Sequence, residues 1–330
     1  MKANFVRNFI GIVELKVELK KYIRILLAFV LVITGCSNVF ESAARKNTDE
    51  AYYEEARKAI NNFDYDLAIT NFEKMGPSFL ATTVVREAYA GALAGKCGLN
   101  FLDYVEALSG ASLSGSTIFI YAMSAWDGVN VSPVHCLRAE QQIKAIWAVE
   151  TATATQKFFM AILGLAKMGA YLRSKADVDG ASNLGNGVTD STFDACLATP
   201  GGPNNLTDDE VGEVLTGLML FLTNITDFAA SLSSDVSGST SGITAACASM
   251  ADPPLSLPAN QIICNYTDWA NVTPADKAAV VAIVRDMLAT GATTTDAAAR
   301  FGLGSPVSAG NVGFEVDGSC SLNPFVLCCP

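Results

Sequence analysis

The sequence predicts an all-α fold, and three observations support this class. Apolar residues recur with the three-to-four-residue spacing of a buried helix face in several segments. Residues that start and stop helices border those segments, as Thr273-Pro274 does before the last of them. Alternation of apolar and polar residues with a period of two, which is typical of strands, is scarce. We therefore expect helices joined by long, irregular connections.

The first 35 residues have the layout of a secretory signal. Basic residues between positions 20 and 24 precede an apolar run over 25–33, and small residues follow that run. The stretch Ile33-Thr34-Gly35-Cys36 then resembles the lipobox of bacterial lipoproteins. That resemblance implies cleavage between Gly35 and Cys36 and acylation of Cys36 with palmitate or a similar fatty acid. Ser37 stands where lipoproteins kept at the inner membrane often carry Asp, which favours the outer membrane.

A transmembrane anchor is the alternative for the same segment. The apolar stretch from Ile23 to Gly35 spans 13 residues and contains Arg24, whereas a helix needs about 20 residues to cross a bilayer. Two acyl chains give stable attachment without a spanning helix. We therefore expect a cleaved leader over 1–35, a lipidated tether over 36–47 and attachment to the membrane through the lipid on Cys36.

The charge of the remaining chain disfavours one class of partner. The full sequence has 22 Lys and Arg and 33 Asp and Glu, and residues 1–35 hold six of the former and two of the latter. Residues 36–330 therefore carry 16 basic and 31 acidic side chains, a net charge near −15. Such a chain is repelled by nucleic acid and by anionic lipid headgroups, so we expect neither as a partner.

The cysteine count predicts a disulfide framework. Nine cysteines, less the acylated one, leave an even number in an exported chain. Sequence does not define the pairing, and our working pairs are Cys247 with Cys264 and Cys320 with Cys328 or Cys329. A metal site is disfavoured because the chain has no Cys-x-x-Cys and only one histidine. The disulfide candidates are Cys97, Cys136, Cys196, Cys247, Cys264, Cys320, Cys328 and Cys329.

Two antiparallel helices are expected at the start of the segment 48–108. Thr48-Asp49 can cap the first helix, Asn61-Asn62 breaks the chain, and Gly76-Pro77 ends the second helix, whose inward residues include Leu67. Small side chains on both helices would allow the close approach that an antiparallel pair requires.

This pair resembles one tetratricopeptide repeat. Residues 64–69 match the start of the family's second helix, and Ala68 and Phe72 stand four apart at its small and aromatic positions. Tyr52 departs from the pattern, because the family has tryptophan there. A weaker match over 85–108 implies a second hairpin. Because two repeats are fewer than a free-standing solenoid needs, we expect the rest of the chain to cover them.

Residues 109–303 are expected to form a larger helical bundle with Gly/Ser-rich loops. An apolar island at Ile118–Met123 predicts one short helix. Leu137–Arg173 is predicted to be one long helical stretch, buried because it is apolar on nearly all sides. Gly164 and Gly169 within it would let a neighbouring backbone approach closely, or mark a kink.

A loop over Asp177–Pro203 is expected next, with Cys196 as a staple. Thr207-Asp208-Asp209-Glu210 predicts a capping box before an apolar helix over Val211–Leu232. Asp227 within that helix, together with its acidic opening, favours a core helix over a membrane span.

The C-terminal part contains one further clear helix. A Ser/Gly-rich break at 233–242 is followed by a short helix expected over 243–250. Thr273-Pro274-Ala275-Asp276 then opens a helix with a cap, an early proline and an acidic first turn, and Gly291 ends it. Residues 304–330 are expected to be an irregular, Cys-rich tail that disulfides hold in order.

No group of residues predicts an enzyme. His135 beside Cys136 is the single Cys/His adjacency, and sequence neighbours rarely reach the roughly 3 Å geometry that a nucleophile and its base need. A loop histidine next to a disulfide is the expected role. Glycine signatures for phosphates or dinucleotides are missing, so we expect no catalytic residues and no cofactor.

A partial calcium motif follows residue 176. Asp177-Val178-Asp179-Gly180 resembles the start of an EF-hand loop, but Ala181 replaces the next oxygen ligand and the bidentate Glu is absent. Asn186 and Asp190 could still contribute oxygens. The expectation is a solvated acidic loop without a metal, and a calcium site is the alternative.

The overall resemblance implies a binding protein. Tyr52, Tyr53 and Tyr65 could line a groove for a peptide or a partner helix, with core packing as the alternative for each. Tetratricopeptide lipoproteins associated with TRAP-type transporters are the preferred family, because a long apolar helical region follows the repeats; they imply a ligand cavity or pore. The assembly lipoprotein of the outer-membrane β-barrel machinery, whose repeats hold partner proteins, is the other.

The sequence therefore predicts a non-enzymatic lipoprotein of the outer membrane that faces the periplasm, or the exterior if flipped. Its expected role is a helical scaffold or adaptor for a protein of the cell envelope. The alternative is a transport-associated component that binds a small molecule in a cavity lined by 143–172 and 211–232. A solid core there, with an exposed groove near 52–108, would favour the scaffold.

Overall fold

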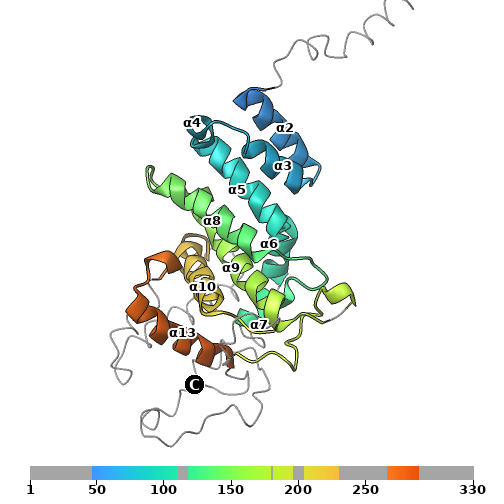
Figure 1. Cartoon of the computed structure of the whole chain (residues 1–330), viewed down its shortest axis with the longest axis vertical. Helices are drawn as coiled ribbons and strands as arrows, with labels where there is room; N and C mark the ends of the chain where they lie inside the picture. The colour runs from blue at the N-terminus through green and yellow to red at the C-terminus, as the bar shows by residue number, and fades with distance from the viewer. Residues whose placement is uncertain (1–46, 111–117, 180, 196–203, 230–265, 290–330) are drawn as a thin grey trace, which may run out of the picture. The chain divides into compact units, whose positions relative to one another are not determined.

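The computed structural model describes residues 47–110, 118–179, 181–195, 204–229 and 266–289. Within these ranges the chain forms ten α-helices and two short 3₁₀ helices, η1 (Ala181–Asn183) and η2 (Trp269–Asn271), and no strand (Figure 1). The all-α class is therefore confirmed. The chain divides into two compact units, residues 1–51 and 52–330, and the helical bundle discussed below belongs to the second.

Helices α2 (Asp49–Asn61) and α3 (Tyr65–Phe72) are present where the first two helices were expected, and the Tyr53 ring of α2 meets the Phe72 ring of α3 edge-on. Phe63 lies between them with a left-handed φ of 59°, and the Asp64 carboxylate caps α3 by accepting the Leu67 N–H at 3.1 Å. One prediction here is wrong, because Leu67 is exposed. The apolar stripe of α3 instead runs through its buried residues Ala68, Ile69 and Phe72.

Helix α5 (Thr83–Cys97) follows the short α4 (Pro77–Leu80) and ends at Gly98, whose φ of 108° supports a left-handed C-cap. It packs along α3 and, more extensively, along α8. Its expected hairpin partner, α6 (Phe101–Gly110), contacts it much less. The tetratricopeptide-like packing therefore stays a prediction.

The predicted single stretch over Leu137–Arg173 is wrong, because it is two helices. Helix α8 (Pro133–Trp147) stops, and α9 (Ala154–Ala176) starts anew after a six-residue link. A capping box explains the restart: Thr153 Oγ1 accepts the Gln156 N–H at 3.2 Å, and Gln156 Oε1 accepts the Thr153 N–H at 3.1 Å. The short helix predicted at the apolar island is present as α7 (Ile118–Ser124).

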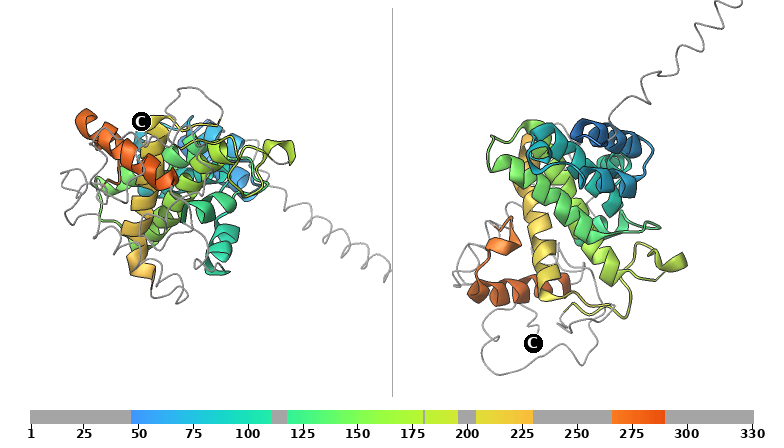
Figure 2. Two further views of the ribbon diagram at one scale, coloured as in Figure 1. Left: turned by 90° about the horizontal axis from the view of Figure 1, so that it is seen from below. Right: turned by 45° about the horizontal axis from the view of Figure 1, so that its top comes forward.

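Helix α9 is the centre of the bundle. Every residue from Met160 to Arg173 is buried, and α7, α8 and α10 (Asp208–Ala229) all pack on it. The most extensive contact is between α9 and α10, which pack along each other (Figure 2). A Cβ on Gly164 would lie 2.6 Å from the Gly217 carbonyl oxygen, and the reverse holds for Gly217.

The two C-terminal helix predictions are confirmed within the described ranges. The capping box before α10 is formed, because Glu210 Oε2 accepts the Thr207 N–H at 2.8 Å and Thr207 Oγ1 accepts the Glu210 N–H at 3.3 Å. Helix α13 (Pro274–Ala289) begins at the predicted proline and packs against α10. Among the helices in these ranges, none is long and apolar enough to cross a membrane.

Candidate functional site

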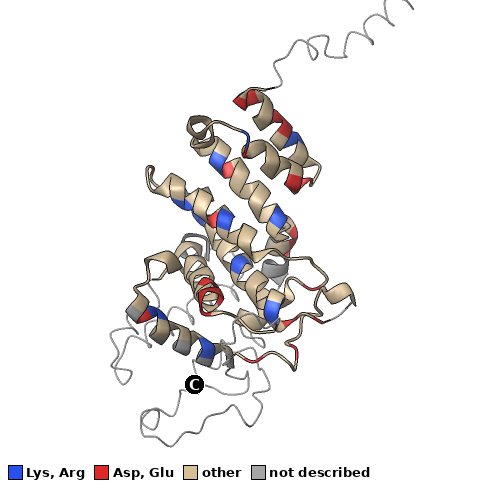
Figure 3. Cartoon of the chain, viewed as in Figure 1, with Lys and Arg blue, Asp and Glu red and all other residues tan. Residues whose placement is uncertain are grey.

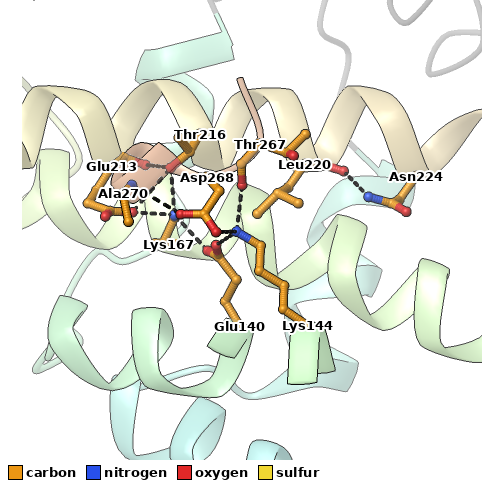
Figure 4. Close-up of polar contacts among 10 residues, drawn as sticks. All are labelled: Glu140, Lys144, Lys167, Glu213, Thr216, Leu220, Asn224, Thr267, Asp268 and Ala270. Carbon is orange, nitrogen blue, oxygen red and sulfur yellow. Dashed lines mark hydrogen bonds and ion pairs between the residues drawn. The ribbon is translucent and has the colours of Figure 1, made fainter. Parts of the chain in front are cut away.

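The most unusual group in the bundle is a lysine in its core. Lys167, in the middle of α9, has a fully buried side chain. Its ammonium lies 2.6 Å from Glu140 Oε2, 2.6 Å from Glu213 Oε2 and 2.8 Å from Thr216 Oγ1 (Figure 4). Three acceptors therefore match the three N–H donors of an ammonium group, which is what its burial requires.

A second lysine extends this cluster to a distant segment. Lys144, one turn after Glu140 on α8, contacts Glu140 Oε1 at 2.5 Å and donates to the carbonyl oxygen of Thr267 at 2.6 Å. Asp268 Oδ2 lies 3.5 Å from the same ammonium. We call Glu140, Lys144, Lys167, Glu213, Thr216 and Asp268 the charge network; it joins α8, α9 and α10 to the segment before η2.

Electrostatics keep the Lys167 side chain charged. Burial by itself lowers the pKa of Lys167, but the charges of Glu140 and Glu213 and their hydrogen bonds outweigh burial and raise it above its usual 10.5. Because its charged ammonium donates to Glu213 and Thr216 and pairs with Glu140, Lys167 is not a free nucleophile. The arrangement can hold helices in register, and it offers no side chain for catalysis.

Another buried cation, Arg285, joins α13 to the start of α10. Arg285 on α13 donates to the carbonyl oxygens of Ala195 and Leu206, both at 2.9 Å, and to Asp208 Oδ1 at 2.9 Å. It thus ties α13 to the two ends of the segment that precedes α10. Acidic residues are gathered at the first turn of α10, where the helix dipole favours them (Figure 3).

Two of the eight predicted disulfide cysteines lie in the described part of the chain. Cys97 at the end of α5 and Cys136 in the first turn of α8 form a buried disulfide with an S–S distance of 1.97 Å. The working pairs of Cys247 with Cys264 and of Cys320 with Cys328 or Cys329 lie outside the described residues. So do Cys196, the cleavage site at Gly35 and the lipidation site Cys36.

His135 is not in a loop, contrary to the prediction, because Pro133 begins α8 and places it in the first turn. Its Nδ1 lies 2.7 Å from Ser132 Oγ. Burial and the nearby charges of Arg138 and Lys96 lower its pKa below 6.5. The histidine is therefore held neutral beside the disulfide at neutral pH.

Each of the three groove candidates packs against a different neighbour. Tyr53 meets the rings of Phe72 and Phe79 edge-on, both at 6.3 Å between centroids. Tyr52 lies under the Lys74 ammonium at 5.6 Å, and the Tyr65 ring lies against Gly95, where a Cβ would be 2.2 Å away. All three are half-buried. Tyr53 matches the core-packing alternative, and the groove stays a prediction.

Several segments near the C-terminal end of α5 carry exposed apolar side chains. Lys96 there bonds Asp66 of α3 at 2.7 Å, and the N–H of Ser132, next to α8, donates to the Cys97 carbonyl oxygen at 3.0 Å. The start of α3, the end of α5 and the start of α8 are therefore neighbours. Four exposed apolar side chains lie on or beside these segments or on α6, which starts shortly after α5 ends. We call them the helix-end surface: Phe63 before α3, Leu67 in α3, Leu102 in α6 and Val134 in α8.

Sequence reasoning missed both the charge network and the helix-end surface. Their members are far apart in the chain, and single charged or apolar residues on a helix carry no signal of their tertiary neighbours. Comparison of the chain with protein families, with curated proteins and with solved structures found no match.

Proposed function

We propose that this chain is an exported, lipid-anchored protein that acts as a helical scaffold and binds a protein partner in the cell envelope. The observation that carries the proposal is the helix-end surface. Its four apolar side chains lie on different segments, and Phe63 is 74% exposed. Side chains of this kind are enriched in protein–protein interfaces, where burial against a partner removes them from water.

The surroundings of the helix-end surface support the same role. The Lys96–Asp66 ion pair and His135 lie beside the apolar residues, which gives the polar rim that protein interfaces have. The buried Cys97–Cys136 bond crosslinks α8, which carries Val134, to the C-terminal end of α5. Disulfides of this kind persist in oxidising compartments, which supports export.

The small-molecule alternative receives less support from the same helices. The cavity would lie between the apolar parts of α8, α9 and α10. There, Gly164 and Gly217 bring two backbones into contact, and the side chain of Lys167 fills space between the same helices. A closely packed interface with ion pairs between its helices favours the scaffold.

Photo-crosslinking in intact cells tests the scaffold. A photoreactive amino acid placed at Phe63 or at Leu67 should give a crosslink to one protein. The same group at Val149, which is 80% exposed but lies beyond the other end of α8, is the matched control and should give none. Equal crosslinking from all three positions, or none from any, would contradict the proposal.

A substitution at Phe63 provides a second test of the scaffold proposal. Phe63→Asn removes the apolar ring while tolerating the left-handed φ of this position, so it should abolish co-purification of the crosslinked protein without changing the thermal unfolding midpoint. If native mass spectrometry instead finds a bound small molecule and no protein, the transport-associated alternative replaces the scaffold.

A further inference from the structure

Three carboxylates converge at the C-terminal end of α9. Asp177, Asp179 and Asp190 each place one carboxylate oxygen within 4.8 Å of the other two. Oxygen ligands of one calcium ion lie about 2.3–2.6 Å from it, so two of them can be separated by at most about 5 Å. The three oxygens therefore have the mutual spacing of ligands around a single ion.

A buried carboxylate oxygen that accepts no hydrogen bond is an independent indication that this cluster binds a cation. Asp190 is only 7% exposed, and its Oδ2 accepts the Val178 N–H at 2.7 Å. Its Oδ1 is buried, and no N–H or O–H in the described residues donates to it. Asp179 lies within side-chain hydrogen-bonding reach of Asp190. Such a bond requires a proton on one of the two; when both are charged, both are acceptors and they repel each other. A buried acceptor in this state is costly unless a cation binds it.

The charges of the three carboxylates and of the nearby arginine favour a divalent cation. Three carboxylates bring three negative charges, and Arg173 is the cation that acts on Asp177. Arg173 is itself buried and donates to the Asn183 carbonyl oxygen at 2.8 Å. About two negative charges therefore remain unbalanced where the buried Asp177 and Asp190 meet the exposed Asp179. One divalent cation would relieve the repulsion between them.

We propose that the loop over 177–190 binds one calcium ion through Asp177, Asp179 and Asp190. The donors in this cluster are carboxylate oxygens, which suit hard cations and not zinc or copper. Calcium accepts irregular coordination by loop residues, whereas magnesium demands a near-octahedral shell at about 2.0–2.1 Å. This inference does not depend on the scaffold proposal.

Backbone contacts already organise the loop for such a site. The N–H groups of Asn186 and Gly187 donate to the two Asp177 oxygens at 2.8 and 2.9 Å. Gly185 has a left-handed φ of 79°, and a Cβ there would lie 2.6 Å from Asp177 Oδ2. The side-chain oxygen of Asn186, the other ligand of the sequence alternative, accepts the Val188 N–H at 2.9 Å, which engages one of its two lone pairs.

Calcium would also tighten the contact between this loop and α13. Beyond Asp190 the chain continues through the buried residues Phe193 and Ala195, and Arg285 donates to the Ala195 carbonyl oxygen. The position of the loop is therefore linked to the position of α13. We expect calcium binding to raise the free energy of unfolding of the bundle.

Titration of the purified full-length lipoprotein tests the site. After treatment with EGTA and buffer exchange, isothermal calorimetry with calcium chloride should show one ion per chain. The expected Kd is below about 1 mM, the range of extracellular calcium modules. Calcium should also raise the thermal unfolding midpoint, and magnesium chloride at the same concentration should bind at least tenfold more weakly.

Matched variants locate the ion. Asp190→Asn and Asp179→Asn should each weaken calcium binding at least tenfold; Asp179 is exposed, so its variant keeps the test valid if Asp190→Asn fails to fold. Asp103→Asn makes the same charge change at an exposed residue of α6 and should leave binding unchanged. No binding at several millimolar calcium, or equal loss in all three variants, would overturn the proposal.

Discussion

The single residue with the largest consequence for this core is Lys167. Moving an isolated ammonium group out of water costs several kcal/mol, and only the paired carboxylates of Glu140 and Glu213 offset that cost. Replacement of such a network by apolar residues is often neutral in other proteins, so its value lies in specifying one arrangement of α8, α9 and α10.

Removal of this lysine alone should be strongly destabilising. Lys167→Met leaves Glu140 and Glu213 without their cation, and we expect a loss of about 3–5 kcal/mol in the free energy of unfolding, measured by urea denaturation. Lys58→Met, which breaks an exposed pair with Glu55 at 2.8 Å, should change it by less than about 0.5 kcal/mol.

Neutralising the partners should reverse part of this loss. Lys167→Met combined with Glu140→Gln and Glu213→Gln leaves no unpaired buried charge, so the triple variant should be more stable than the single one. A triple variant that is less stable than Lys167→Met would show that the carboxylates contribute through other contacts. Because the pKa of Lys167 is raised, its contribution should persist at neutral pH and be lost only as the pH rises above 10.5.

At the scale of helices, the α9–α10 crossing depends on glycine. Gly164 has no room for a Cβ, because the Gly217 carbonyl oxygen and Leu220 Cβ lie within 3 Å of its ideal position. Gly164→Ala should therefore push the two helices apart and lower the free energy of unfolding by about 1–3 kcal/mol.

A glycine without neighbours provides the control for this substitution. Gly91 in α5 has no atom within 4 Å of the position that a Cβ would take, so Gly91→Ala should raise stability by about 0.5–1 kcal/mol through helix propensity. Chemical denaturation of both variants side by side measures the difference. Equal effects of the two alanines would mean that the crossing relaxes without strain.

The disulfide fixes the pairing of α5 with α8. It closes a loop with a sequence separation of 39 residues, for which the chain-entropy relation gives about 4 kcal/mol. Cys97→Ala with Cys136→Ala should lower the free energy of unfolding by about 2–4 kcal/mol, and peptide mapping of the non-reduced parent should recover the crosslinked pair. Recovery of Cys97 as a free thiol from the exported protein would contradict this assignment.

At the scale of the whole molecule, the proposed lipid anchor makes a testable prediction about where the protein is located. Cys36→Ser should move the chain from the membrane fraction to the soluble fraction and abolish incorporation of labelled palmitate, because two acyl chains supply the attachment. Cys97→Ala is the control, since a cysteine outside the lipobox should leave acylation unchanged. Membrane retention of Cys36→Ser without lipid would instead favour the transmembrane anchor.

Local signals predicted most of the helices, and their failures have identifiable causes. The capping box at Thr207 and the proline start of α13 were correct because both act within one helical turn. The continuous stretch over 137–173 failed because apolar periodicity concealed a second capping box at Thr153, a signal that was present in the sequence. Leu67 failed because periodicity alone does not define which face of a short helix is covered.

By itself, the sequence determined the all-α class, the positions of most helix ends and the presence of carboxylates that could bind a cation, since each depends on residues close together in the chain. Only the tertiary structure decided that α5 pairs with α8, that Lys167 is matched by acids 27 and 46 residues away, and that Asp190 turns back onto Asp177 and Asp179. Those outcomes depend on which surfaces bury each other, and burial is a property of the packed chain that no local pattern carries.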